Sequence, residues 1–254
     1  MRLFTVDAFT GTAFKGNPAG VCLLESPVND RWMRSVAAEL KHSETAFLLG
    51  DSLRWFTPTV EVTLCGHATL ATAHILYSTG AATGPVEFQT AGGTLTVNHL
   101  PDGMITMDFP AKEVTPSPVP DGLEKALGVT PLRVGKSHLD LLIEVDSEET
   151  VRTLSPDIAA LTAVDARGVI VTAPGTETDF VSRFFAPNVG VPEDPVTGSA
   201  HCALSPYWSA RLGRDSLVGA QLSPRGGIVH VRHAGDRVHL SGHAVTIFSG
   251  TLHV

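Results

Sequence analysis

An internal repeat is the feature of this sequence that most constrains its fold. Three stretches of the first half return in the second half in the same order: residues 56–62 as 185–191, 66–71 as 198–203, and 92–99 as 226–233. The spacing between the copies is constant within each stretch and grows by a few residues from one stretch to the next. A duplication followed by small insertions in loops leaves such a pattern. The sequence therefore predicts two similar halves, each with the same passage from a loop into a helix.

Composition excludes several classes of function. The net charge of −8 disfavours nucleic acid and anionic membranes, which both bind basic surfaces, so we expect neither as a partner. No stretch approaches the roughly 18 apolar residues of a membrane-spanning helix, and residues 1–7 lack the apolar run of a signal peptide. The cysteines Cys22, Cys65 and Cys202 are too few, and odd in number, for a disulfide framework. We therefore expect a cytoplasmic protein.

The hydrophobic pattern predicts an α+β architecture, with a curved sheet wrapped around one principal helix in each half. The principal helices are expected to begin near Gly66 and Gly198, and glycines at 80 and 213 are expected to end them. Asn29 or Asp30 is expected to cap a further helix that ends near His42.

A proline-rich stretch separates the two halves. Residues 110–120 contain prolines at 110, 116, 118 and 120 and few large apolar residues, which predicts a stiff linker. We expect an N-terminal lobe over residues 1–112 and a C-terminal lobe over residues 121–254. The last strand of the chain could return to the first lobe.

The two glycines at the starts of the principal helices allow two interpretations. A helix N-terminus exposes unpaired N–H groups and positive potential, and a glycine lets a ligand approach that backbone closely, so the pair could hold a carboxylate. The alternative is that Gly66 and Gly198 only permit a tight turn between strand and helix. The occurrence of the feature in both halves favours a binding role.

Four side chains near these junctions could carry chemistry. Glu44 lies between a helix and a strand, where it is either solvated or placed in a pocket that suits proton transfer. The positive helix end should keep His67 neutral, although it could simply bond to backbone. Asp194 precedes the other helix, where aspartate is commonly an N-cap. Cys65 is either a base beside a helix N-terminus or an ordinary core residue.

Taken together, these residues resemble the phenazine biosynthesis-like (PhzF-like) family, which is related in fold to diaminopimelate epimerase. The motifs are residues 6–9 (VDAF), 16–21 (GNPAGV), 43–47 (SETAF), 65–69 (CGHAT) and 193–201 (EDPVTGSAH). The resemblance extends over essentially the whole chain. It implies two pseudo-symmetric lobes, each a β-barrel-like sheet around a central helix, with the site in the cleft between them. It also implies a cofactor-independent isomerase that is usually a homodimer.

The family also implies roles for individual residues. The glutamate matching Glu44 moves a proton between carbons of a small carboxylic acid, and the positions matching His67 and Asp194 assist it. Backbone around Gly66, Gly198 and Ser199 would hold the substrate carboxylate. A further position, Asn17, would lie at the edge of the cleft as a substrate contact.

Other functions remain open at this point. An epimerase could use Cys65 and Glu44 as unlike bases, but the second motif lacks the thiol that a symmetric two-cysteine enzyme needs. A binding protein could retain the cleft without turnover. We expect no metal, because the histidines at 230, 233, 239 and 243 lie in strands without a complementary cysteine or carboxylate. We expect no nucleotide cofactor, because no glycine-rich phosphate loop is present.

Overall fold

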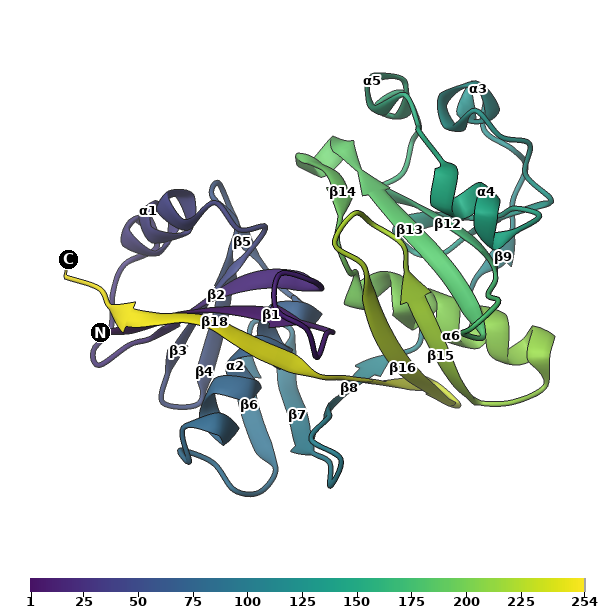
Figure 1. The fold of residues 1–254 in the computed structure, drawn as a ribbon. Helices are drawn as coiled ribbons and strands as arrows, with labels where there is room; N and C mark the ends of the chain where they lie inside the picture. Colours follow the sequence, from purple (N-terminus) through teal and green to yellow (C-terminus); the bar gives the residue numbers. More distant parts are fainter. Residues whose placement is uncertain (254) are drawn as a thin grey trace. The chain divides into compact units, whose positions relative to one another are not determined.

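The computed structural model describes residues 1–253 and has a mixed α+β fold (Figure 1). The chain divides into two compact units. The first unit comprises Met1–Phe109 together with the chain from Leu240 onward, and the second comprises Pro110–His239. Each unit contains its own strands and its own long buried helix.

In the first unit the strands pair in the order β18, β1, β2, β3, β4, β6, β7 and β8. The β2–β3 and β4–β6 pairs are parallel and the others are antiparallel. The strands are β1 (Arg2–Ala8), β2 (Asn17–Leu23), β3 (Thr45–Leu49), β4 (Ser52–Phe56), β5 (Glu61–Val62), β6 (Val86–Thr90), β7 (Gly93–His99), β8 (Ile105–Pro110) and β18 (Ala244–Thr251).

Helix α1 (Asp30–Leu40) makes the crossover that the parallel β2–β3 pair requires. The side chain of Asn29 caps its first turn by accepting a hydrogen bond from the Trp32 N–H, and Lys41 ends the helix in the left-handed conformation. Its buried face, which includes Met33 and Val36, packs with Phe47. This packing fixes the segment that leads into β3.

Helix α2 (Gly66–Ser78) is the central helix of the first unit, and it contacts β1, β2, β3, β7 and β18. It has no polar face: most of its residues are buried from His67 to Ile75. Its buried hydroxyls are satisfied locally, since Thr69 and Thr72 donate to the carbonyls of Cys65 and Ala68. A helix apolar all round is expected in a core.

The second unit repeats this pairing order. Strands β10, β11, β12, β13, β15 and β16 pair in sequence, and the second and fourth of these pairs are parallel, as they are in the series that runs from β1 to β7 in the first unit. The strands are β9 (Thr115–Pro116), β10 (Arg133–Lys136), β11 (Asp140–Glu144), β12 (Gly168–Pro174), β13 (Phe180–Ala186), β14 (Val191–Asp194), β15 (Ser216–Gln221), β16 (Gly227–Ala234) and β17 (Arg237–Gly242), which crosses the unit boundary. The sequence repeat thus has a counterpart in the strand pairing.

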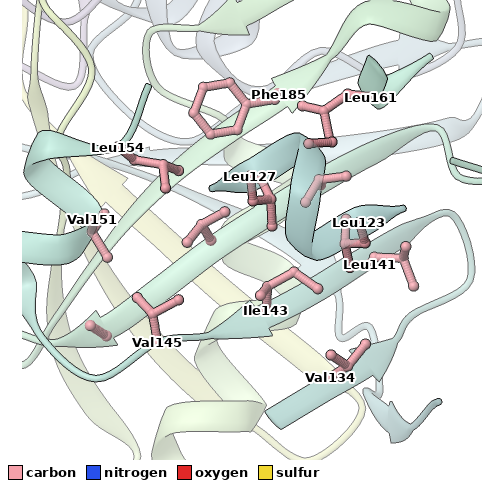
Figure 2. Close-up of a cluster of buried hydrophobic side chains, with 14 of the residues drawn as sticks. Leu123, Leu127, Val134, Leu141, Ile143, Val145, Val151, Leu154, Leu161 and Phe185 are labelled. Atoms are coloured by element: carbon pink, nitrogen blue, oxygen red, sulfur yellow. The ribbon is translucent and has the colours of Figure 1, made fainter. Parts of the chain in front are cut away.

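The second unit also has a central helix, α6 (Gly198–Leu212), with Pro206 inside it and Gly213 at its end. Three short helices cover the other side of the sheet: α3 (Leu123–Leu127), α4 (Glu148–Thr153) and α5 (Ile158–Leu161). Figure 2 shows their apolar side chains packed on β11, β12 and β13. The first unit has the longer α1 in the corresponding crossover.

The units divide the chain differently from the predicted ranges 1–112 and 121–254. Residues 110–120 belong to the second unit, where β9 pairs with β10, so this proline-rich stretch is built into a sheet. Strand β18 returns to the first unit and pairs with β1. Over residues 1–253, every helix is too short or too polar to cross a membrane.

Candidate functional site

The start of α2 forms a buried polar cluster in the first unit. Cys65 is extended and the helix begins at Gly66, so the His67 side chain lies in the first turn. His67 is buried, with a relative exposure of only 4%. The predicted start of this helix is thereby confirmed.

Glu44 reaches this cluster from the strand side. It directly precedes β3, and its carbonyl oxygen accepts a hydrogen bond from the Gly20 N–H on the parallel neighbour β2. Its side chain is 19% exposed, and Oε2 lies 3.4 Å from Nε2 of His67. Glu44 is therefore neither solvated nor sealed off, which is the placement that a proton-transferring carboxylate needs.

His67 is neutral near pH 7. Burial, and secondarily the nearby His42, lower the pKa of His67 from 6.5 to about 3. The positive end of α2 acts in the same direction. Its contact with Glu44 is therefore not an ion pair at this pH. Within residues 1–253, Nε2 makes no well-aligned hydrogen bond, so the 3.4 Å contact leaves room for rearrangement.

Cys65 contacts the opposite nitrogen of the same ring. Its Sγ lies 3.6 Å from Nδ1 of His67, and the polar atoms of Glu44, Cys65 and His67 lie within 4.8 Å of one another. These three residue types can ligate a metal ion. However, each ring nitrogen faces a different partner, whereas a ligating imidazole turns one nitrogen to the ion. The imidazole of His67 lies between the Cys65 thiol and the Glu44 carboxylate, an arrangement that suits proton exchange better than metal binding.

Asn17 supports the Glu44 segment. It is the first residue of β2, it is fully buried, and its Oδ1 accepts a hydrogen bond of 3.4 Å from the hydroxyl of Ser43. Ser43 is the residue before Glu44, so the buried amide helps to fix the backbone that presents the carboxylate. The predicted substrate contact by Asn17 stays a prediction.

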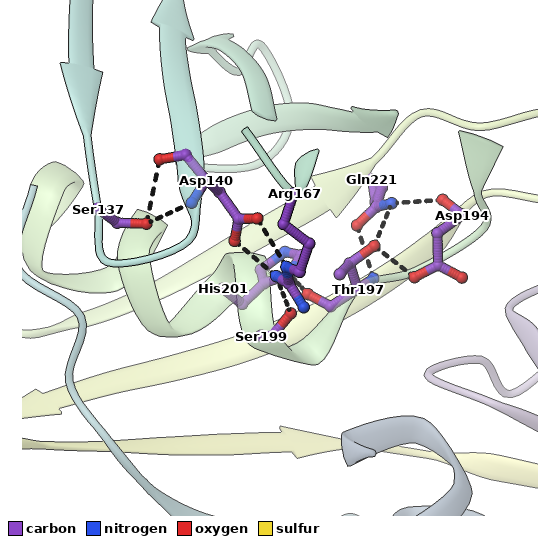
Figure 3. A network of polar contacts seen from close by, with 8 residues as sticks. All are labelled: Ser137, Asp140, Arg167, Asp194, Thr197, Ser199, His201 and Gln221. Atoms are coloured by element: carbon purple, nitrogen blue, oxygen red, sulfur yellow. Dashed lines mark hydrogen bonds and ion pairs between the residues drawn. The ribbon is translucent and has the colours of Figure 1, made fainter. Parts of the chain in front are cut away.

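The start of α6 forms a second polar cluster, which lies in the second unit (Figure 3). Asp194 accepts a hydrogen bond of 2.5 Å from the hydroxyl of Thr197, and Thr197 is the N-cap residue. The interpretation of Asp194 as an ordinary N-cap is therefore wrong. The Gln221 side chain donates to the Asp194 carbonyl and accepts from the Thr197 N–H, which ties the loop to β15.

Gly198 and Ser199 are the first two residues of α6, and no side chain caps this helix. The Ser199 hydroxyl oxygen accepts a hydrogen bond of 3.0 Å from the guanidinium of Arg167. That guanidinium in turn binds both carboxylate oxygens of Asp140 (Figure 3). Arg167, Asp140 and Gln221 were not predicted from the sequence, although the charged residue at the start of the apolar strand 140–144 was a signal.

The structure thus groups the predicted residues into two sets. Glu44, His67 and Cys65 contact one another in the first unit, with Asn17 behind them. Asp194, Gly198 and Ser199 surround the start of α6 in the second unit. Both sets lie at the junctions that the repeat indicates.

Comparison with known proteins identifies the class. The family model for phenazine biosynthesis-like proteins (PhzC-PhzF) matches residues 6–250. An uncharacterized isomerase of Halalkalibacterium halodurans is 48% identical, and the alignment covers 98% of this chain and 97% of that protein. The crystal structure of a PhzF-family phenazine biosynthesis protein from Enterococcus faecalis has a TM-score of 0.94 at 41% identity, with 100% of this chain and 99% of that one covered.

A similar fold also occurs in a more distant protein. A probable proline racemase from Agrobacterium radiobacter has a TM-score of 0.68 at 12% identity, covering 99% of this chain and 92% of that one, a likeness of fold alone. Within that fold, this chain belongs to the PhzC-PhzF family of phenazine biosynthesis-like proteins. The resemblance expected from the motifs is confirmed.

Proposed function

We propose that this protein is a cofactor-independent isomerase that moves a proton between two carbons of a small carboxylic acid. Glu44 is the general acid and base. The observation that carries the proposal is the position of Glu44, partly exposed and 3.4 Å from a buried, neutral His67. The isomerase names of close relatives support it.

The reaction needs no net exchange of protons or electrons. The Glu44 carboxylate accepts a proton from an acidified C–H, and the electron pair left behind delocalises towards the substrate carboxyl group. Glu44 then returns the proton to a second carbon. Neutral His67 can donate from Nε2 to the carboxylate, and its other tautomer can accept from the protonated acid. N–H groups at the start of α2 would stabilise the developing negative charge.

The contacts of Cys65 weigh against a two-base epimerase. Such an enzyme places its bases on opposite faces of one carbon, each roughly 3–3.5 Å from it, so the bases stand roughly 6–7 Å apart. The polar atoms of Cys65 and Glu44 lie within 4.8 Å of each other. A carbon does not fit between them. A supporting role for Cys65 through His67 agrees better with this spacing.

Other parts of the proposal rest on the family resemblance. We propose that Gly66, Gly198, Ser199 and Asn17 contribute to substrate binding and that Asp194 orients a polar substituent. Each unit would be a barrel-like sheet around its central helix, and the protein would act as a cytoplasmic homodimer. Sedimentation tests the homodimer, and subcellular fractionation tests the cytoplasmic location.

Exchange with solvent tests the role of Glu44. Small carboxylic acids with an activated neighbouring C–H are incubated in heavy water with the wild type and with Glu44→Gln, and deuterium incorporation is followed by mass spectrometry. We expect incorporation by the wild type and a loss of 10²- to 10⁴-fold in the variant. Glu61→Gln, which alters a carboxylate of the same unit that pairs with Arg54, is the matched control. Equal incorporation by wild type and Glu44→Gln would reject the assignment.

Wild-type protein that binds these acids without exchange or isomerisation would instead identify a binding protein.

A further inference from the structure

The charged pair behind the start of α6 extends the proposed function. Asp140, the first residue of β11, is completely buried. Arg167, which directly precedes β12, donates from Nε to Oδ1 at 2.8 Å and from Nη2 to Oδ2 at 2.6 Å. A buried carboxylate requires such a partner, and the two-pronged geometry fixes the guanidinium plane. Arg167 is thus held in one orientation by a residue on the neighbouring strand.

The same guanidinium determines how Ser199 can bond. A guanidinium only donates hydrogen bonds, so the Ser199 oxygen is the acceptor in the 3.0 Å contact. The hydroxyl proton of Ser199 is then free to point away from Arg167, and within residues 1–253 the contact with Arg167 is the one hydrogen bond found for this hydroxyl. Ser199 lies in the first turn of α6, where the backbone N–H groups also lack side-chain partners. The site therefore presents a set of donors, which is what an anion binds.

The charged side chains next to Ser199 also influence which ligand could bind there. Burial lowers the pKa of the nearby Lys112, which also interacts electrostatically with Arg167 and Asp140, so the guanidinium is the positive charge in direct contact with Ser199. The phenyl ring of Phe184 lies under the guanidinium, 5.6 Å from it, and limits its movement. The guanidinium beside Ser199 favours a negatively charged ligand at that hydroxyl over a neutral one of the same shape, whereas the Asp194 carboxylate bound to Thr197 acts in the opposite direction.

We propose that Arg167, held by Asp140, is a positioning residue that turns the Ser199 hydroxyl into a hydrogen-bond donor for the carboxylate of the substrate. Its action on Ser199 is a property of the second unit itself. Only the identity of the anion as the substrate carboxylate rests on the proposed function.

A cysteine at position 199 gives a test that needs no substrate. The Ser199→Cys thiolate displaces iodide from iodoacetate, a small carboxylate, or from iodoacetamide, its neutral counterpart, and a C–S bond replaces the C–I bond. The ratio of the two rates measures the preference for a carboxylate, and the pH dependence of the iodoacetamide rate gives the pKa of the new thiol. The parent protein corrects for the three natural cysteines, which are all buried.

The rates are compared with Arg167 intact and in three variant backgrounds. Arg167→Lys keeps the charge but not the fork, and Arg167→Met removes both. The double variant Asp140→Asn with Arg167→Met removes the pair together and leaves no buried charge without its partner. With Arg167 intact we expect the pKa of the new thiol to be lowered. We also expect its ratio of iodoacetate rate to iodoacetamide rate to exceed the same ratio measured for free glutathione. That preference should fall about tenfold in both Arg167→Met backgrounds and less in Arg167→Lys.

Thermal unfolding of each variant separates this effect from a structural one. A role limited to stability would lower the unfolding temperature but leave the rate ratio and the thiol pKa of the folded protein unchanged, and that result would overturn the proposal. Failure of the heavy-water experiment would leave the thiol measurements unaffected. The two proposals can therefore fail separately.

Discussion

The starts of α2 and α6 have the same architecture but place different chemical groups around it. By the sequence repeat, the second residue of α2, His67, corresponds to the second residue of α6, Ser199. In the first unit this position contacts a carboxylate, and in the second it contacts a guanidinium. His67 and Glu44 can therefore exchange a proton, whereas Arg167 can only donate hydrogen bonds to Ser199 and supply positive potential. The contacts of the repeated position thus support different proposed roles: proton transfer in the first unit and the holding of an anion in the second.

The strand register shows why the second unit has no copy of Glu44. Thr45 pairs with Phe56, and Val169 pairs with Phe185, the counterpart of Phe56. The counterpart of Glu44 is therefore Gly168, beside Arg167. A Cβ atom at Gly168 would lie 2.3 Å from the ring of Phe184, so a side chain there would require that ring to move. The ring that lies against the Arg167 guanidinium thus occupies the space that a carboxylate side chain at this position would need.

The two units should differ most in how much stability they lose when the first residue of β2 or of β11 is changed. Asn17 and Asp140 are both fully buried, but only Asp140 is charged and bound to an arginine. We expect Asp140→Asn to lower the free energy of unfolding by about 3 kcal/mol, and Asn17→Ser by about 1 kcal/mol. Urea denaturation measures both. Equal losses would mean that the buried charge is not what distinguishes the second unit.

The corresponding positions His67 and Ser199 should differ in which kinetic parameter they affect. His67→Ala removes a proton-exchanging group, and we expect kcat to fall about 100-fold with little change in KM. Ser199→Ala removes one donor to the substrate, and we expect KM to rise about tenfold with kcat nearly constant. Steady-state kinetics on an acid identified by deuterium exchange would show this. The reverse pattern would contradict the proposed division of roles.

Lowering the pH should reduce the folding stability of both units, because each contains a buried histidine. Burial lowers the pKa of His67 to about 3 and that of His201 to about 4, both from 6.5. The unfolded chain binds these protons first as the pH falls, so each histidine reduces stability from about pH 6.5 down to its folded pKa, and the effect is absent above that range. One such group contributes about 1.4 kcal/mol per pH unit.

Unfolding free energies measured between pH 4.5 and 6 in His67→Asn and His201→Asn should each show a smaller slope than the wild type. An unchanged slope in either variant would mean that the histidine concerned is not held neutral. His99→Asn is a suitable control, because His99 lies on a strand surface.

The smallest effect is expected at Cys65. If this thiol acts only through its contact with His67, Cys65→Ala should reduce turnover by less than about tenfold, because the base and the imidazole remain. Cys202→Ala, which changes a buried thiol of α6, is the matched control in the other unit. A loss as large as that of Glu44→Gln would favour the two-base epimerase.

Much of this arrangement could be predicted from the sequence, because repeated residues mark repeated structure. The glycines at 66 and 198 located both helix starts, and the segment around Glu44 indicated a junction beside a buried strand. The Asp140–Arg167 pair could not be predicted, because it depends on the register of two parallel strands joined by a long crossover. Helix α4 was missed because only Val151 is buried in it, which leaves no apolar periodicity to detect.

The return of β18 to pair with β1 has a consequence for biosynthesis. A ribosome releases the residues of the second unit before it releases the strand that completes the first. Until that strand is added, the first unit keeps an open sheet edge on β1. The part of the protein made first is thus the last to be finished, and a stop codon shortly before residue 244 would leave the Glu44 half incomplete while sparing the Arg167 half.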